Sequence, residues 1–358
     1  MRCRLEVNLT ALSENYASAR DMLDSGSQLI AVLKSDAYGL GAAALAQTLR
    51  GLGVTRFAVA TYEEAMELKE AVPDADILLM GWIDPARLES AIANGIIMTV
   101  YSSKSAKEIS CAGLRAGKKA RGHIKLDTGL HRIGFDPWDI TELRGVMTLD
   151  GLSVEGLYTH LALHSALSDA RQLSAFRETV TALGQDRLFL HALDSIGMVR
   201  YPDHHLDGVR VGAWLFGVCP KGHPHPERCK PVTRLVTRVA QLRRVNRGEC
   251  VGYDNQYPLL RDSVIATLIA GYGDGYPRLN NTGAVEIRGR RAPIAGLVCM
   301  DYIMADVTDI PEAKEGDEVI LLGGSISIDE YAENGNFNRN EALTRISRRV
   351  PRVYVYNK

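Results

Sequence analysis

The segment that decides the fold is LIAVLK at residues 29–34, a short apolar run that ends in a lysine and is followed by the turn-rich sequence SDAYG at 35–39. A run of this length, closed by polar and turn-forming residues, predicts a buried β-strand. Segments of another kind, such as TYEEAMELKEAV at 61–72 and DPARLESAIANG at 84–95, place apolar residues at helical spacing. Strands that alternate with helices indicate a parallel sheet covered by helices.

This strand-and-helix unit recurs through the first 220 residues. We predict eight strands, at residues 29–34, 56–60, 77–80, 97–100, 123–126, 154–159, 188–192 and 209–215. Eight such units in a chain of this length predict a TIM barrel, in which eight parallel strands close into a cylinder surrounded by helices.

The pattern changes near Pro220, where KGHPHPERCKP at 221–231 gathers turn residues and charges. The runs beyond it are short, β-rich and punctuated by glycine, as in VTRLVTRVAQLRRV at 232–245 and EVILLGG at 318–324. We therefore expect an α/β protein with a TIM (β/α)8 barrel at residues 1–220, followed by a mainly antiparallel β domain at residues 221–358.

The charge balance favours a small-molecule partner. Lys and Arg number 42 against 43 Asp and Glu, so the formal net charge is −1 and no basic surface for nucleic acid or an anionic membrane is expected. The six cysteines are scattered, without the close pairs of a zinc or redox motif. No stretch approaches the roughly 18 apolar residues of a spanning helix. We expect a cytoplasmic protein with no metal and no nucleic-acid or membrane partner.

Candidate catalytic groups follow the predicted strands, at the face where TIM barrels build their active sites. Lys34 closes the first strand behind an apolar stem. If it enters the barrel mouth partly shielded from water, its pKa falls and the neutral amine that attacks carbonyl compounds is favoured. The alternative is an ordinary surface lysine at a strand end.

Further candidate residues gather at the same face, after or on the fifth to eighth strands. They are Arg132, His160, Ser195, Arg210 and Gly212. A rim of small and hydroxyl-bearing residues after strands seven and eight often holds a phosphate in such barrels. A lone His or Arg at a strand end more often belongs to a structural hydrogen-bond network, but this many at one face indicate a site for a phosphate-bearing cofactor.

Eight segments of the chain resemble the alanine racemases, and they occur in order from the first strand to the C-terminus. They are AVLKSDAYGLG (31–41), KLDTGLHRIGF (125–135), GLYTHLA (156–162), GVRVGAWLFG (208–217), VGYDNQY (251–257), IAGYGDGYPR (269–278), GLVCMDYIMADV (296–307) and SRRVPRVY (347–354). The resemblance implies an isomerase that interconverts L- and D-alanine for peptidoglycan, with pyridoxal phosphate as cofactor and a homodimer that shares its active sites.

The resemblance also implies roles for single residues. Lys34 would carry the cofactor covalently and act as one base, and Tyr253 from the partner subunit would be the second catalytic base. Arg132 would contact the cofactor's ring oxygen and the substrate carboxylate, and Arg210 would face the pyridine nitrogen with His160 beside it. The phosphate would be held by Tyr38, Ser195, Gly212 and Ala213. The partner's substrate entrance would be lined by Tyr272, Met300 and Asp301. Lys125 matches a position that is sometimes a carbamylated lysine.

Several residues depart from the family pattern. Ser35, Asp36 and Leu40 stand where Ala, Asn and His are common, and Asp194 stands where Asn is usual. Arg348 replaces a tyrosine close to the phosphate, and its guanidinium could bind the phosphate through charge-assisted hydrogen bonds. The alternative is that Arg348 points to solvent or pairs with a carboxylate.

Because of Arg348, a serine or broader-specificity racemase is kept as an alternative to alanine. A non-catalytic pyridoxal-phosphate carrier on the same barrel is a rival of another class, but such carriers lack a C-terminal domain with Tyr253 and Met300. A decarboxylase or aldolase would show a different motif in place of GYDNQY.

Overall fold

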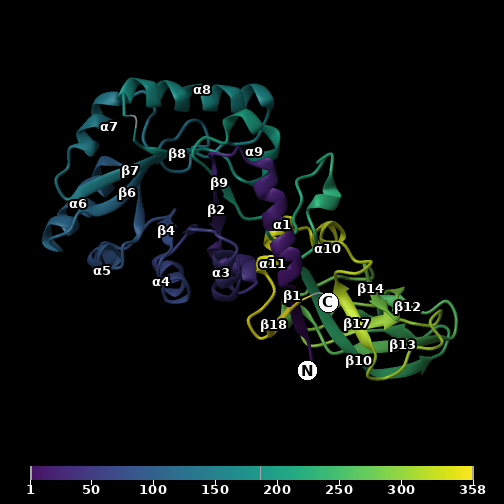
Figure 1. Cartoon of the computed structure of the whole chain (residues 1–358). Helices are drawn as coiled ribbons and strands as arrows, with labels where there is room; N and C mark the ends of the chain where they lie inside the picture. The colour runs from purple at the N-terminus through teal and green to yellow at the C-terminus, as the bar shows by residue number, and fades with distance from the viewer. Residues whose placement is uncertain (1, 186, 357–358) are drawn as a thin grey trace.

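A closed barrel of eight parallel strands forms the larger part of the computed structural model, which describes residues 2–185 and 187–356 (Figure 1). Its strands are β2 (Gln28–Val32), β3 (Arg56–Val59), β4 (Asp76–Leu79), β5 (Ile97–Val100), β6 (Ala120–Lys125), β7 (Leu152–Tyr158), β8 (Phe189–His191) and β9 (Gly208–Val211). Each pairs in parallel with its neighbours, and β9 closes the barrel against β2. The prediction of eight strands and a TIM barrel is confirmed.

Helices cover the outside of the barrel (Figure 1). They are α1 (Leu9–Met22), α3 (Ala42–Gly51), α4 (Tyr62–Ala71), α5 (Leu88–Ala93), α6 (Ser103–Arg115), α7 (Ile140–Met147), α8 (Ala166–Leu183) and α9 (Ser195–Arg200). α4 begins at a capping box in which Thr61 and Glu64 each bind the other's backbone amide, an arrangement that satisfies two free N–H groups at once. The segments at 61–72 and 84–95, which were predicted as helices from their apolar spacing, contain α4 and α5.

The second part is a mainly antiparallel sheet. Its main path runs β15 (Arg290–Pro293), β14 (Ala284–Ile287), β17 (Glu318–Leu322), β10 (Thr233–Val245), β1 (Arg4–Asn8) and β18 (Arg352–Val355), and β13 (Ser263–Leu268) pairs with β10 and with β16 (Ile303–Asp306). A two-stranded ribbon, β11 (Cys250–Val251) and β12 (Tyr257–Pro258), extends from it. Two helices that the sequence did not indicate, α10 (Ile328–Gly335) and α11 (Arg339–Thr344), also belong here.

The first strand departs from the prediction that residues 1–220 form the barrel domain. β1 pairs antiparallel with β10 and parallel with β18, so the chain begins in the second sheet. Leu5 and Val7 alternate with polar residues and are fully buried, which suits a strand that is half covered by a core. On the other face Arg4 and Glu6 form ion pairs that join β1 to β10 and β17.

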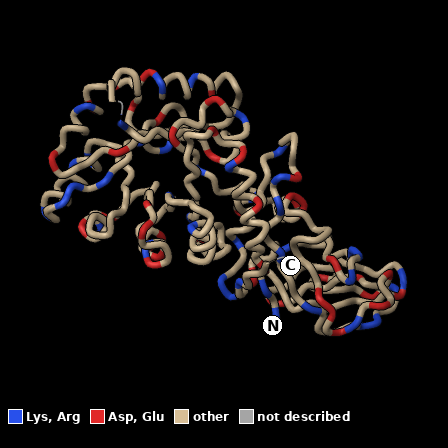
Figure 2. The backbone as a smooth tube through the Cα atoms, in the orientation of Figure 1, with Lys and Arg blue, Asp and Glu red and all other residues tan. Residues whose placement is uncertain are grey.

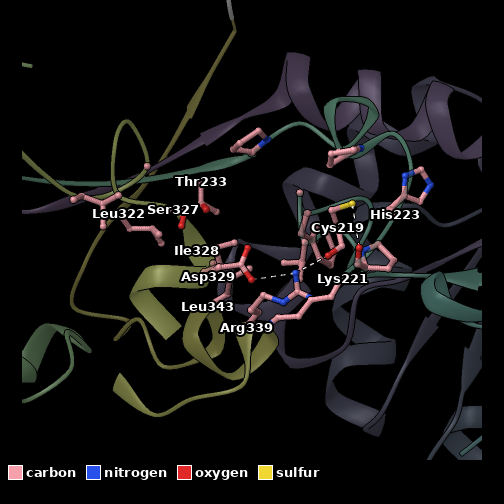
Figure 3. A pocket seen from close by; sticks show the side chains of 18 of the residues that line it. Cys219, Lys221, His223, Thr233, Leu322, Ser327, Ile328, Asp329, Arg339 and Leu343 are labelled. Carbon is pink, nitrogen blue, oxygen red and sulfur yellow. Dashed lines mark hydrogen bonds and ion pairs between the residues drawn. The ribbon is translucent and has the colours of Figure 1, made fainter. Parts of the chain in front are cut away.

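A cavity of about 430 Å³ lies where the chain passes from the barrel into the second part (Figure 3). Arg339 of α11 spans the junction, because its Nη1 donates to the carbonyl oxygen of Cys219 at 2.6 Å and lies 3.4 Å from Asp329 Oδ1. α11 is therefore tied to the segment that leaves the barrel.

Charges are interspersed over both parts, as Figure 2 shows. No helix among the described residues combines the length and apolar composition needed to cross a membrane.

The contact between Gly41 and Tyr354 gives a test of how the two parts fit together. Gly41 has φ +98°, and an added Cβ would collide with the Tyr354 hydroxyl. Gly53 has φ +99° with nothing nearby, so Gly53→Ala should lower the free energy of unfolding by about 1–2 kcal/mol through backbone strain alone. Gly41→Ala should cost roughly 1–3 kcal/mol more because of the collision.

Urea unfolding of both variants measures this difference, and Tyr354→Phe in the Gly41→Ala background should recover part of it. Equal losses in the two glycine variants would show that the contact is not as described.

Candidate active site

Lys34 begins an unusual backbone turn at the mouth of the barrel. β2 ends at Val32, and the segment α2 (Lys34–Gly39) follows with positive φ at four consecutive residues that are not glycine: Ser35 (53°), Asp36 (54°), Ala37 (52°) and Tyr38 (58°). A left-handed conformation costs roughly 1–2 kcal/mol per L-residue. Neighbouring groups must therefore hold this turn in place.

Contacts from both parts of the protein hold the left-handed turn. Glu64 Oε1 of α4 accepts from the Ser35 amide at 2.6 Å, and Asp36 Oδ1 accepts from the Ala42 amide at 2.7 Å. From β18, Arg352 Nε donates to the Gly39 carbonyl at 2.8 Å. Arg352 also donates to the carbonyls of Ile346, Ser347 and Val350. The loop before β18 and the lysine turn are thus joined through one guanidinium.

A cavity of about 480 Å³ opens at the carboxyl ends of the barrel strands, next to Lys34. Its volume is typical of small-molecule sites. Eight residues predicted from the sequence line it: Lys34, Tyr38, Arg132, His160, Ser195, Arg210, Gly212 and Ala213. Lys125, Tyr158, Asp194 and Asn340 also line it. The strand-end residues are therefore brought together at one site, while their individual roles stay predictions.

Arg210 is the buried centre of a hydrogen-bond network below this cavity. Its Nη1 lies 2.6 Å from His191 Nδ1, and its Nη2 lies 3.1 Å from His160 Nδ1 and 2.8 Å from the carbonyl oxygens of Thr159 and Ala192. Because a guanidinium only donates, both Nδ1 atoms must accept. Burial and the Arg210 charge lower the pKa of His160 to about 2 and hold that of His191 well below its usual value. Both imidazoles are therefore neutral.

The neutral state of His191 extends the network one residue further. With Nδ1 as acceptor, the proton of His191 sits on Nε2, which lies 3.0 Å from His123 Nδ1 and donates to it. Tyr158 stacks on the His191 ring with centroids 4.6 Å apart, and its hydroxyl lies 2.8 Å from Thr99 Oγ1. Burial lowers the pKa of Arg210 to about 10, which leaves the guanidinium charged at neutral pH. His191 and His123 are network members that sequence reasoning missed, although each histidine lies on a predicted strand.

Two lysines at the cavity have lowered pKa values. Burial, followed by the charges of Arg132 and Arg210, lowers the pKa of Lys34. Burial, followed by Arg210, lowers the pKa of Lys125 to about 7, and its Nζ donates to the Leu126 carbonyl. Loss of the proton is therefore easier for both amines than for an exposed lysine, and the neutral amine is the state that attacks a carbonyl carbon.

Hydroxyl donors line the side of the cavity formed after β8 and β9. Ser195 Oγ accepts from the amides of Gly212 (3.1 Å) and Trp214 (3.3 Å), which leaves its own proton free to donate. Burial, with a contribution from Asp194, raises the pKa of Tyr38 to about 12, so its phenol stays protonated and is also a donor. Two such donors beside the Gly212 backbone suit an anionic group such as phosphate.

Asn340 is a cavity residue that the sequence did not reveal. It lies in the first turn of α11 and lines the cavity together with Lys34 and Tyr38, and its Oδ1 is buried without a hydrogen-bond partner. The N-cap Asn338 was the available signal, because Asn is common at helix starts. An unpaired buried carbonyl oxygen is costly, so an occupant that donates to it would relieve that cost.

The remaining predicted residues do not line the cavity of their own chain. Tyr253 and Met300 are exposed on the second part, by 62% and 53%, and Tyr272 is exposed as well. Asp301 accepts from Arg349 at 2.6 Å and pairs with Arg2 at 3.3 Å.

Arg348 is exposed, and within the described chain it makes no hydrogen bond or ion pair. The structure does not bring it into the cavity, so a phosphate contact from Arg348 stays a prediction.

The fold and the site define a barrel enzyme whose strand-end lysine is suited to bond a carbonyl group. A family model described as alanine racemase, N-terminal domain, matches residues 7–220, and one described as alanine racemase, C-terminal domain, matches residues 232–354. The chain therefore belongs to the alanine racemase family, as its motifs had indicated.

Relatives and solved structures agree with this assignment. The chain is 37% identical to alanine racemase 1 of Caldanaerobacter subterraneus, over 99% of this chain and 95% of the relative, and 38% identical to an alanine racemase of Sorangium cellulosum, over 98% of each. The alanine racemase structure of Clostridium difficile superposes with a TM-score of 0.95 at 31% identity, over 100% of this chain and 96% of that one. That of Bartonella henselae, which has covalently bound pyridoxal phosphate, superposes with 0.91 at 30% identity, over 99% and 100%.

The neutral state of His160 predicts a pH dependence of stability. The unfolded histidine takes up a proton below about pH 6.5, whereas the folded one, with a pKa of about 2, does not. The free energy of unfolding therefore falls as the pH decreases below 6.5. His160→Gln keeps an acceptor for Arg210 and removes this dependence, so between pH 6.5 and 5 it should lose about 1–2 kcal/mol less than the wild type.

Urea unfolding at several pH values measures this, with the exposed His131→Gln as control. Parallel curves for wild type and His160→Gln would mean that His160 takes up a proton as readily in the folded state as in the unfolded state.

Proposed function

We propose that this protein is a pyridoxal-phosphate-dependent alanine racemase. The observation that carries the proposal is the convergence of Lys34, Arg132 and Arg210 on one cavity at the barrel mouth, in a chain that is similar to alanine racemases over its whole length. Serine or broader specificity stays open on the same site, because Arg348 replaces the family's tyrosine.

The residues at the cavity fit pyridoxal phosphate. When bound, this cofactor supplies the electron sink that removal of an α-proton requires. Lys34, with its lowered pKa, would bond it, and Tyr38, Ser195, Gly212 and Ala213 would hold its phosphate. Arg210 would face the pyridine nitrogen and cannot give up a proton there, because its guanidinium stays charged. A sink of reduced strength suits racemisation, since it limits side reactions.

The second base should come from another subunit. Racemisation needs a base on each face of the α-carbon, and Lys34 supplies one. Tyr253, Tyr272 and Met300 are exposed on the second part of the chain and do not line its own cavity. This arrangement supports a homodimer in which the second part of each chain, including Asp301, completes the partner's site. The domains would divide near residue 220, with β1 added to the second.

Two further features complete the proposal. The buried Lys125 amine, with a pKa of about 7, is suited to carbamylation, and a carbamate would place a negative charge near Arg132 and Arg210.

The six cysteines are free thiols, which supports a reducing, cytoplasmic location. There the enzyme would supply D-alanine for peptidoglycan.

Lys34→Ala should abolish the visible absorbance of the lysine-bound cofactor, since no other amine is proposed to bond it. Lys125→Ala is the matched control, because Lys125 lines the same cavity and its loss should leave the band in place. Absorbance spectra after dialysis against pyridoxal phosphate give the answer. A band that persists in Lys34→Ala, or that disappears only in Lys125→Ala, would refute the assignment.

Tyr253→Phe should keep the cofactor but lower racemisation by roughly 10²–10⁴-fold, as expected when a general base is lost.

Mixing Lys34→Ala with Tyr253→Phe subunits tests whether sites are shared. In a heterodimer with shared sites, both substitutions fall in one active site and the second active site is wild-type, so activity returns. Chiral chromatography of the products from L-alanine and from L-serine measures the racemisation rate. No recovery in verified heterodimers would mean that each chain builds its own site.

A further inference from the structure

Asp194 is the single carboxylate among the described residues that line the barrel cavity. Two lysines and two arginines line the same cavity: Lys34, Lys125, Arg132 and Arg210. In a partly buried site such a charge imbalance is energetically significant. Asp194 is therefore the carboxylate of the lining that can offset part of this excess of basic groups.

The position of Asp194 is fixed by the backbone. It is the N-cap of α9, where its Oδ1 accepts from the amides of Ile196 at 3.0 Å and Gly197 at 2.9 Å. Within the described chain no hydrogen bond reaches its Oδ2, which leaves that oxygen available to the cavity. An N-cap needs an acceptor oxygen and not a charge, since Asn and Ser cap helices about as well as Asp. The fold therefore does not require the negative charge.

The charges that act on Lys34 come from four elements. Arg132, after β6, and Arg210, on β9, lower its pKa in addition to burial, whereas Asp194, before α9, and Glu64, on α4, act in the opposite direction. Both Glu64 oxygens already accept backbone amides, from Ser35 and Ala60. The other titratable groups that line the cavity are Tyr38, Lys125, Tyr158 and His160, and none of these is a carboxylate.

We propose that Asp194 is a positioning residue for Lys34, holding its amino group in the cavity as an ammonium until a carbonyl compound arrives. The carboxylate offsets part of the repulsion from Arg132 and Arg210 and so raises the pH at which Lys34 becomes a nucleophile. This inference deepens the proposed function and rests on it, because it takes Lys34 as the reactive amine. An uncharged residue at 194 would leave the fold intact and release the proton at lower pH.

The test measures the ionisation of Lys34 without any cofactor. The full-length chain is freed of bound carbonyl compounds with hydroxylamine and dialysed, then acetylated with trace acetic anhydride at a series of pH values. Mass spectrometry of the Lys34 peptide gives the pH midpoint of its reactivity. Asp194→Asn is compared with Asp139→Asn, which makes the same change at the N-cap of α7, outside the cavity.

Asp194→Asn should lower the midpoint by about half a pH unit or more, as expected for the loss of a nearby opposite charge, and Asp139→Asn should leave it unchanged. Asp194→Ser serves as a second variant that keeps the cap, and it should shift the midpoint in the same direction. A smaller fall, no change or a rise in the folded Asp194 variants would overturn the proposal. Failure of the wild type to form a visible band with pyridoxal phosphate would instead count against the proposed function.

Discussion

The left-handed turn that presents Lys34 is the constraint on which the site depends. Four consecutive L-residues from Ser35 to Tyr38 adopt positive φ, and local preference alone would not keep them there. Glu64 on the barrel and Arg352 on the second sheet hold the two ends of the turn. The lysine is therefore placed by the junction of the two parts, and the second part contributes to the site of its own chain even before any partner is considered.

Around this turn the protein arranges charge so that each group keeps one protonation state. Buried Arg210 is surrounded by acceptors, two of them neutral imidazoles, and remains a cation. Tyr38 remains a phenol, and its hydroxyl and that of Ser195 are left to donate. The two lysines are the exceptions, because burial lowers the pKa of each while neighbouring charges act on it in both directions. The roles proposed for Lys34, which are to bond the cofactor and to exchange a proton with the substrate, require such a balance.

Much of this could be predicted from the sequence, for identifiable reasons. Strands such as β2 and β5 are short apolar runs that are almost wholly buried, and polar residues such as Lys34 and Arg210 follow or interrupt the barrel strands, so strands and site residues were found together. The left-handed turn was not predicted, because it depends on Arg352, more than 300 positions away. β1 was missed for a similar reason: five alternating residues are a weak local signal, and their partners β10 and β18 lie far along the chain. Asn340 was hidden in a short helix whose tertiary contact decides its role.

The proposed chemistry requires that this turn presents Lys34 as the amine that carries the cofactor. Borohydride reduction of the protein loaded with pyridoxal phosphate, followed by peptide mass mapping, tests it most directly. We expect one phosphopyridoxyl group per chain, on Lys34. Modification of Lys125 or of any other lysine in its place, or no covalent modification at all, would contradict it.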